Sequence, residues 1–323
     1  MMANANMDKS VGFVGLGNVG AKLAGSLLRN GVDLTVRDLD KKAAAPLLAA
    51  GVKWADSAAE MAANCDILIT CLPSPVISAQ VLEAEDGLLA GWAAGKIWAE
   101  MSTTDETEIH RLGAKITAMG GRVADCPVSG GCHRAATGNI SIFAGCARDV
   151  FDDMLPYLTK MGRRILHTGP LGSATVLKVV TNYLATANLV SVAEALSTCA
   201  AAGIDLRTSY EAIAISSGTS FVHETEGQVI LNGSRDINFT MDLVLKDISL
   251  FQDVAVRAGL ALELAPLLID IFKDGIEKYG GRELSPNIIR RLEEAHNLDV
   301  TAPGFPAEMT DDEPEAPGYE VVL

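Results

Sequence analysis

Short apolar runs, rich in β-branched residues, recur through the first half of the chain and alternate with helical patterns. Four of them lie at residues 11–14, 34–38, 66–73 and 96–101, and residues 135–145 read as a further strand. Runs of this kind are typical of strands that are buried on both faces of a parallel sheet. The pattern therefore predicts an α/β Rossmann-type domain with a parallel sheet over residues 1–170.

After Gly169 to Gly172 the strand pattern stops and long helical patterns replace it. The first begins at Gly172, runs towards Gly203 and is apolar nearly all round, as a buried helix is. Further helical patterns cover residues 208–215, 241–258, 262–279 and 287–296. The sequence thus predicts an all-α domain over residues 171–298, joined to the first domain by a long interdomain helix.

Residues 299–323 form an acidic tail. The segment contains several prolines, and all of its charged side chains are acidic. A segment of this composition buries too little apolar surface to form a core element. We expect an extended arm, and the pattern leaves open whether the final residues, 319–323, dock on a neighbour.

A glycine-rich turn connects the first strand to the first helix. Its glycines are spaced as in the dinucleotide-binding fingerprint, and an acid, Asp38, closes the next strand. These glycines permit a tight turn, a close approach of the pyrophosphate and close packing of the helix on the strand. We predict cofactor contacts at Gly15, Leu16, Gly17, Asn18, Val19 and Asp38.

Asp38 also bears on the choice between NAD and NADP. Its carboxylate accepts hydrogen bonds from ribose hydroxyls and repels a 2′-phosphate, and neither Leu39 nor Asp40 supplies a positive charge. Arg37 could swing towards a 2′-phosphate, but strand alternation points it away from Asp38. The sequence therefore predicts NAD as the cofactor in preference to NADP.

Two further strands end in segments that face the expected cofactor. Leu72 and Pro73 follow one strand and Thr103 follows the next, at the edge where an open parallel sheet binds its ligands. A helix N-cap or a simple turn explains each of these residues equally well.

Ser129, Gly130 and Gly131 present a hydroxyl and bare backbone amides, which together suit an anion. Taken alone, this tripeptide is more often a flexible turn. Its interpretation depends on the residues that face it.

Lys178 and Asn182 lie four residues apart in the long apolar helix, so their side chains share one face. A buried ammonium needs a partner or a ligand, which makes this face the candidate working surface. The alternative is a structural lysine that extends along the helix to reach water.

Composition excludes several classes of protein. The chain has 26 basic and 41 acidic residues, a net charge of −15, which argues against nucleic acid and anionic membranes as partners. Residues 1–10 lack the apolar core of a signal peptide, and no uninterrupted apolar run reaches about 18 residues. The cysteines show no metal-binding spacing. We expect a cytoplasmic protein without a metal site.

Four separated blocks together resemble the β-hydroxyacid dehydrogenase family, which includes 3-hydroxyisobutyrate dehydrogenase and tartronate semialdehyde reductase. They are residues 11–20, residues 125–131, residues 172–182 with Lys178 and Asn182, and Phe239 with Lys246 and Asp247. They cover residues 11 to 296 in the order that the family has. The resemblance implies NAD(P)-dependent hydride transfer to or from a β-hydroxyacid.

The resemblance also implies roles for single residues. Lys178 matches the catalytic lysine and Asn182 its substrate-orienting partner, while Ser129, Gly130 and Gly131 match the loop that holds the substrate carboxylate. Lys246 matches the lysine of a later helix that closes over cofactor and substrate, with Asp247 beside it. Leu72, Pro73 and Thr103 match contacts near the nicotinamide.

The chain departs from the family pattern after the paired glycines. Cys132, His133 and Arg134 stand where smaller or aliphatic residues are common. His133 and Arg134 are either plain surface residues or contacts to a second polar or anionic group on a larger substrate.

Two rival functions remain on the sequence alone. One is a dinucleotide-binding protein without catalysis, against which the intact Lys178 and Asn182 pair argues. The other is an imine reductase, a relative that usually replaces the lysine. The expected partner is a small carboxylate substrate, and the long apolar helices favour a homodimer or homotetramer.

Overall fold

The computed structural model describes residues 9–323. Most of the N-terminal segment for which no signal peptide is expected, residues 1–8, lies outside the described residues. The chain divides into two compact units, one of residues up to Lys178 together with Asp311–Leu323, the other of Val179–Thr310. The chain therefore passes between the units twice. The stretch that the sequence sets apart as a tail, residues 299–323, is shared between them.

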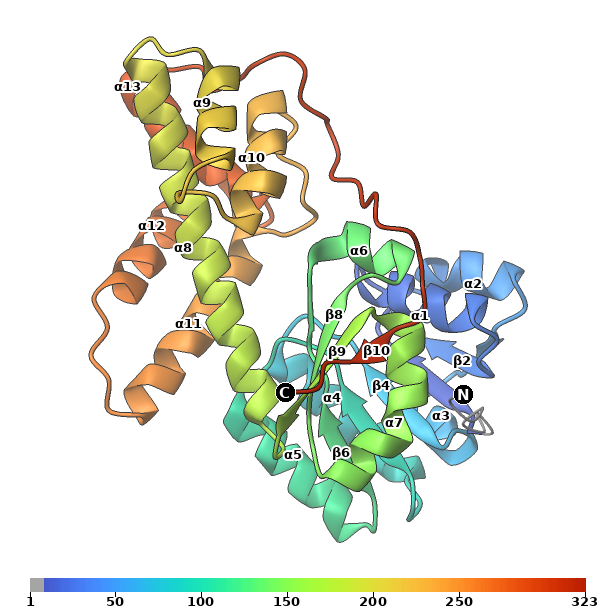
Figure 1. The fold of residues 1–323 in the computed structure, drawn as a ribbon. Helices are drawn as coiled ribbons and strands as arrows, with labels where there is room; N and C mark the ends of the chain where they lie inside the picture. Colours follow the sequence, from blue (N-terminus) through green and yellow to red (C-terminus); the bar gives the residue numbers. More distant parts are fainter. Residues whose placement is uncertain (1–8) are drawn as a thin grey trace. The chain divides into compact units, whose positions relative to one another are not determined.

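The first unit is built on one sheet (Figure 1). Its strand order is β10-β9-β8-β6-β5-β4-β1-β2-β3, with β7 paired to β8. Neighbouring strands are parallel except where β8 meets β6 and β7. The part from β3 to β6 has the strand order of a Rossmann sheet, which confirms the predicted fold class. The strands are β1 (Val11–Val14), β2 (Leu34–Arg37), β3 (Lys53–Trp54), β4 (Ile67–Thr70), β5 (Ile97–Glu100), β6 (Arg122–Asp125), β7 (Val128–Ser129), β8 (Ser141–Gly145), β9 (Arg164–Gly169) and β10 (Tyr319–Glu320).

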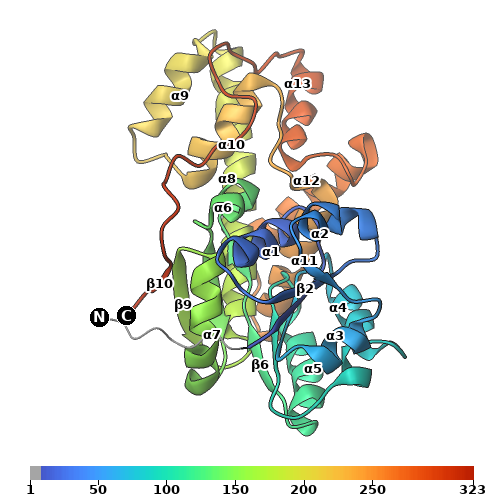
Figure 2. The ribbon, with the colours of Figure 1, turned by 90° about the vertical axis from the view of Figure 1, so that its right-hand side faces the viewer.

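Helices cover both faces of this sheet because successive side chains of each buried strand point to opposite sides. In β4, Ile67 and Ile69 pack into one core cluster and Leu68 packs into the other. Figure 2 shows α1 and α7 on one side of the strands and α3 and α5 on the other. The helices of this unit are α1 (Gly20–Arg29), α2 (Ala45–Ala49), α3 (Ala58–Asn64), α4 (Pro75–Glu83), α5 (Glu106–Ala118), α6 (Gly131–Thr137) and α7 (Arg148–Met161), with short 3-10 turns η1 (Lys41–Ala44) and η2 (Leu88–Gly91).

The strand predicted over residues 135–145 is wrong in its first part. Residues up to Thr137 belong to the helix α6, and only Ser141–Gly145 form the strand β8. Gly138 ends the helix in the left-handed conformation, with φ 78°, as glycine does at many helix ends. The two alanines before it are good helix formers, which the strand interpretation overlooked.

The second unit is helical, as predicted, and encloses one apolar core cluster that includes Leu196, Met241 and Phe272. The long helix α8 begins in the first unit and continues into the second without a break. One helix of this unit, α10, is absent from the sequence-based prediction. The helices are α8 (Ser173–Ala201), α9 (Leu206–Ala214), α10 (Phe221–Asn232), α11 (Met241–Arg257), α12 (Leu264–Tyr279) and α13 (Arg290–His296), with the 3-10 turn η3 (Ser285–Ile289).

The C-terminal residues return to the first sheet. Strand β10 pairs in parallel with β9, so that Tyr319 lies opposite Arg164 and Glu320 opposite Ile165 (Figure 1). The tail is extended, as expected, but its end is an edge strand of the chain's own sheet. The expectation that strands stop after Gly172 is therefore wrong.

Helix α8 is long and apolar enough to cross a membrane by length and composition, with 33% of its most apolar window buried. The sequence-based expectation of no membrane span considers only uninterrupted apolar runs, so it does not include this helix, whose apolar residues are interrupted by polar ones. The core helix of a soluble protein meets the same criteria, so the finding is weak evidence for a membrane span.

Candidate active site

The glycine turn between β1 and α1 has the geometry that a dinucleotide requires. Gly15 has φ 96°, and a Cβ added there would lie 2.2 Å from the carbonyl oxygen of Cys71. A Cβ on Gly20 would lie 2.0 Å from the carbonyl oxygen of Gly15, whereas one on Gly17 would meet nothing within 4 Å. The first and third glycines are therefore fixed by packing, and the second leaves open space where a pyrophosphate fits.

Asp38 lies beside this turn at the end of β2. Its Oδ2 accepts a hydrogen bond from the backbone N–H of Leu16 at 2.6 Å, and its Oδ1 accepts one from Asp40 at 2.9 Å. Each carboxylate oxygen keeps a further lone pair for a ribose hydroxyl. Arg37 instead donates from Nη1 to the carbonyl oxygens of Ala55 and Asp56, at 3.3 and 2.5 Å.

A buried network, which the sequence did not predict, lies beneath the expected nicotinamide rim. The backbone N–H of Leu72 donates to Ser102 Oγ at 2.7 Å, and both the N–H and the hydroxyl of Ser102 donate to Glu100 Oε1. Glu100 has no exposed surface, and this burial raises the pKa of its carboxyl group. The network ties together the loops that carry Leu72 and Thr103, and the only sequence signal for it is an acid inside an apolar strand.

Asp125 connects the strand before the serine-glycine loop to the start of α8. Its Oδ1 accepts from the backbone N–H of Gly172 at 2.9 Å and its Oδ2 from that of Thr175 at 2.6 Å. Burial raises the pKa of this carboxyl group above its ordinary value, although these hydrogen bonds oppose the rise. Asp125 thus caps the helix that carries Lys178, one turn before the lysine.

The serine-glycine loop runs from β7 into α6. Gly130 has φ 130° and Gly131 has φ 87°, conformations that favour glycine. A Cβ on Gly130 would lie 3.3 Å from Cδ of Arg134, so the arginine side chain passes close to the loop. His133 is half-buried, and burial, followed by the charge of Arg134, lowers its pKa. His133 and Arg134 therefore follow the loop directly on α6.

Lys178 is 8% exposed and lies on α8, one turn before Asn182. Within the second unit, Asn182 Nδ2 donates to Asp247 Oδ2 at 2.5 Å, and Lys246 Nζ pairs with Asp247 Oδ1 at 2.7 Å. Asp247 is buried and orients both neighbours. The two units thus each hold part of the predicted site: the cofactor residues, the serine-glycine loop and Lys178 in one, and Asn182, Lys246 and Asp247 in the other.

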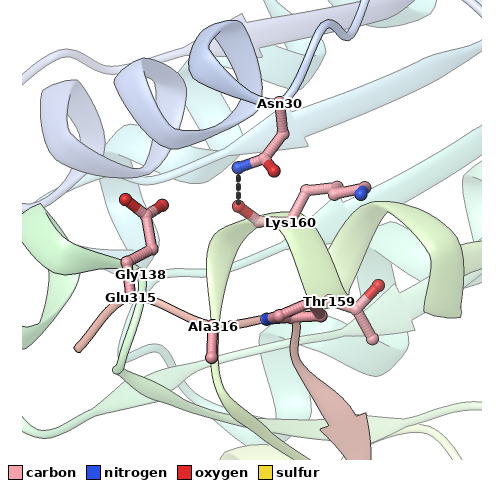
Figure 3. A pocket seen from close by; sticks show the side chains of 7 residues that line it. Asn30, Gly138, Thr159, Lys160, Glu315 and Ala316 are labelled. Carbon is pink, nitrogen blue, oxygen red and sulfur yellow. Dashed lines mark hydrogen bonds between the residues drawn. The ribbon is translucent and has the colours of Figure 1, made fainter. Parts of the chain in front are cut away.

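One small cavity lies away from these residues. It measures about 220 Å³ and is lined by α1, the end of α7 and the C-terminal segment, with Asn30, Lys160 and Glu315 among its residues (Figure 3). In the described part of the chain, no three His, Cys, Asp or Glu side chains gather as a metal site would require.

Comparison with known protein families agrees with this geometry. Residues 10–169 match the model of the NAD binding domain of 6-phosphogluconate dehydrogenase. Residues 172–292 match the model for the NAD-binding region of NADP-dependent 3-hydroxyisobutyrate dehydrogenase. The chain belongs to the β-hydroxyacid dehydrogenase family. The family resemblance predicted from the sequence is thereby confirmed.

The match to individual relatives covers nearly the whole length of each relative. The 2-(hydroxymethyl)glutarate dehydrogenase of Eubacterium barkeri is 31% identical over 298 residues, which are 91% of this chain and 99% of the relative. The NAD-dependent L-serine dehydrogenase of Pseudomonas aeruginosa is 31% identical over 88% of this chain and 97% of its own. The crystal structure of 3-hydroxyisobutyrate dehydrogenase from Salmonella typhimurium superposes with a TM-score of 0.81, at 29% identity, over 88% of this chain and 100% of that chain.

Proposed function

We propose that this member of the family is an NAD-dependent dehydrogenase that oxidises a β-hydroxyacid, with Lys178 as the general acid and base. The observation that carries the proposal is the pairing on α8 of a lysine that is 8% exposed with Asn182 one turn later. An amine that is removed from bulk water and shares a helix face with a polar side chain suits proton transfer.

The chain's own residues have distinct tasks in this mechanism. Ser129, Gly130 and Gly131 hold the substrate carboxylate, and Asn182, which Asp247 orients, positions the hydroxyl group. When the hydroxyl is oxidised, its O–H bond breaks and the proton passes to Nζ of Lys178; in reduction the proton returns to oxygen. Bound NAD supplies the chemistry of hydride acceptance from the hydroxyl-bearing carbon. Lys246, held by its ion pair with Asp247, would supply a positive charge to cofactor and substrate.

NAD is proposed in preference to NADP on electrostatic grounds. Asp38 places a negative charge where a 2′-phosphate would bind, and Arg37 is engaged by two backbone carbonyls. The family model of the second half is named for an NADP-dependent enzyme, so the cofactor must be tested directly.

For the substrate, we propose an acid that carries a second polar or anionic group. Arg134 and His133 follow the carboxylate-binding loop on α6 and would contact the far end of a molecule longer than three carbons. A relative named for 2-(hydroxymethyl)glutarate, a diacid, is in keeping with this class of substrate.

A substrate panel tests the proposal. The purified protein is offered 2-(hydroxymethyl)glutarate, L-serine and 3-hydroxyisobutyrate, each with NAD and with NADP, and formation of reduced cofactor is followed. A cyclic imine is offered separately with reduced cofactor, whose consumption is followed. We expect turnover of at least one acid, with a higher kcat/KM for NAD and the diacid preferred. Cofactor binding without turnover of any acid would favour the non-catalytic alternative, and reduction of a cyclic imine alone would favour an imine reductase.

We also propose that the protein is a homodimer or homotetramer. Leu184 on α8, Ile215 after α9 and Leu267 on α12 are large apolar side chains that are more than half exposed. A native mass equal to that of a single chain, measured by light scattering, would contradict this.

A further inference from the structure

Helix α6 links the proposed carboxylate-binding loop to the rest of the first unit. It has seven residues, begins directly at the paired glycines, and has no side-chain hydrogen bond at its N-cap, Gly130. A helix this short is not stable by itself. The position of its first turn, and therefore of the loop, depends on what holds its other end.

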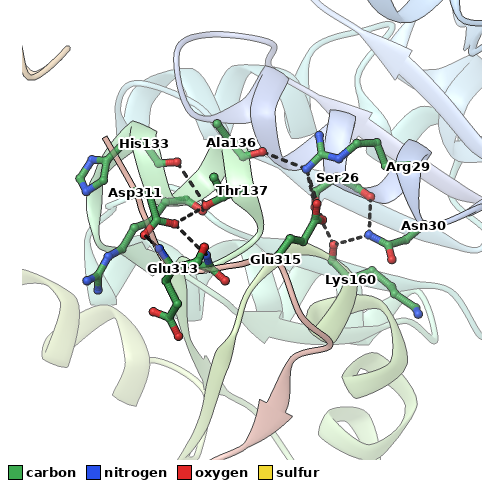
Figure 4. Close-up of polar contacts among 12 residues, drawn as sticks. Ser26, Arg29, Asn30, His133, Ala136, Thr137, Lys160, Asp311, Glu313 and Glu315 are labelled. Carbon is green, nitrogen blue, oxygen red and sulfur yellow. Dashed lines mark hydrogen bonds and ion pairs between the residues drawn. The ribbon is translucent and has the colours of Figure 1, made fainter. Parts of the chain in front are cut away.

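The C-terminal segment holds that end (Figure 4). Thr137 Oγ1 donates to Asp311 Oδ2, and Asn139 Nδ2 donates to the same oxygen at 2.7 Å. Asn139 Nδ2 also donates to the backbone oxygen of Glu313 at 2.6 Å. Asn139 has no exposed surface, so these hydrogen bonds are shielded from water.

The segment is itself fixed to the first unit beyond these contacts. Arg148 makes a two-pronged ion pair with Glu320, at 2.6 and 3.0 Å. The backbone N–H of Tyr319 donates to the carbonyl of Arg163, just before β9, and that of Val321 donates to Ile165 within β9. Asp311 is the residue at which the chain re-enters this unit. The contacts of residues 319–321 therefore hold the C-terminal side of the segment that contains Asp311, and Asp311 in turn holds α6.

We propose that Asp311 is a positioning residue that fixes the C-terminal end of α6 and, through it, the Ser129-Gly130-Gly131 loop. The C-terminal segment is then a working part of acid recognition, although it lies beyond residue 292, where the family match ends. The effect on acid recognition rests on the proposed function, whereas the effect on α6 does not.

Hydrogen exchange of the full-length protein tests the effect on α6. In Asp311→Ala we expect amides of residues 131–139 to exchange about tenfold faster, as the loss of hydrogen bonds to a charged group implies. Amides of β9 should not change. Asp311→Asn is the conservative variant, because one oxygen accepts from both side-chain donors of residues 137–139 and asparagine retains an oxygen; only the N–H of Glu313, which donates to the other oxygen at 3.3 Å, loses its acceptor. This variant should keep the protection of the wild-type protein.

Asp312→Asn is the matched control in the same segment. Asp312 is exposed and directly follows Asp311, so its neutral variant removes one charge from the segment and should leave residues 131–139 unchanged. Unchanged exchange in Asp311→Ala, or equal effects of Asp311→Ala and Asp311→Asn, would overturn the proposal. These readouts need no substrate, so they hold even if the proposed function fails.

Kinetics test the consequence for the acid that gives the best turnover in the panel. Asp311→Ala should raise KM for the acid about tenfold and leave KM for NAD unchanged, while Asp311→Asn stays near the wild type. Thr137→Val removes one of the two side-chain contacts that Asp311→Ala removes, so it should raise KM for the acid by a smaller factor, and the double variant should add nothing to Asp311→Ala. Equal rises in both KM values, or additive effects, would contradict positioning by Asp311.

Discussion

At the scale of single residues, the cofactor site depends on what each position allows its neighbours to do. Gly15 and Gly20 are fixed because a side chain at either would strike backbone, while Gly17 leaves room for a ligand. Asp38 is held beside this turn by the N–H of Leu16 and leaves lone pairs free to accept from a ribose. We therefore expect the charge at Asp38 to decide which nucleotide is favoured.

Asp38→Asn should shift the cofactor preference towards NADP. The variant keeps an oxygen for the N–H of Leu16 but removes the negative charge that opposes a 2′-phosphate. We expect the ratio of kcat/KM for NADP to that for NAD to rise about tenfold or more, a change of about 1.4 kcal/mol. Asp33→Asn, an exposed acid just before the same strand, is the control. An unchanged ratio would mean that Asp38 does not select the cofactor.

Local sequence signals predicted the glycine turn and Asp38. They did not predict residues whose hydrogen-bond partners are distant in the chain. The glycine turn and Asp38 are contained in one stretch of sequence with a known spacing. Glu100 and Asp125 look like ordinary strand residues until folding brings Leu72 to Ser102 and Gly172 to Asp125. The contact of Asn182 with Asp247 likewise joins two helices far apart in the chain.

At the scale of elements, the orientation of α8 matters most, because this helix carries Lys178. Its apolar surface gives it no unique orientation, because it is hydrophobic nearly all round. Asp125 fixes the position of the helix start, because its carboxylate accepts hydrogen bonds from two backbone N–H groups there. The strand β6 and the helix that carries Lys178 are thereby fixed to each other within the first unit.

Asp125→Ala should lower the free energy of unfolding by about 2–4 kcal/mol, because two buried N–H groups at the start of α8 lose their acceptors. Turnover should fall as well, since the helix start is no longer held. Urea denaturation measures the first effect. Asp149→Ala, which removes an exposed acid in the first turn of α7, should change stability by less than about 0.5 kcal/mol. Equal effects of the two variants would contradict the capping role.

Elements with a regular internal pattern were predicted, and those that depend on distant partners were not. Helices α11 and α12 follow their apolar periodicity closely. Strand β10 has only two residues in an acidic segment and exists because β9 offers it an edge. The strand predicted over residues 135–145 joins the residues on either side of Gly138 in one run, whereas Gly138 ends the helix α6.

At the scale of the whole molecule, the chain crosses between its two units at Lys178 and again at Asp311. The predicted cofactor contacts of the glycine turn, Asp38 and the nicotinamide rim belong to the first unit, whereas Asn182 and the further predicted contacts Lys246 and Asp247 belong to the second. The proposed reaction needs residues of both. Cofactor binding and turnover are therefore expected to be separable by substitution, which gives the central claim a direct test.

That test measures two properties of Lys178→Ala, each relative to the wild-type protein. One is the turnover number with the acid that the wild-type protein oxidises best, and the other is the dissociation constant for NAD. The account predicts that kcat falls about 10²- to 10⁴-fold, the usual contribution of a general acid or base, while NAD binding changes less than about threefold. Lys278→Ala, an exposed lysine on α12, should behave as wild type. A turnover number of Lys178→Ala within about tenfold of the wild type would contradict the account.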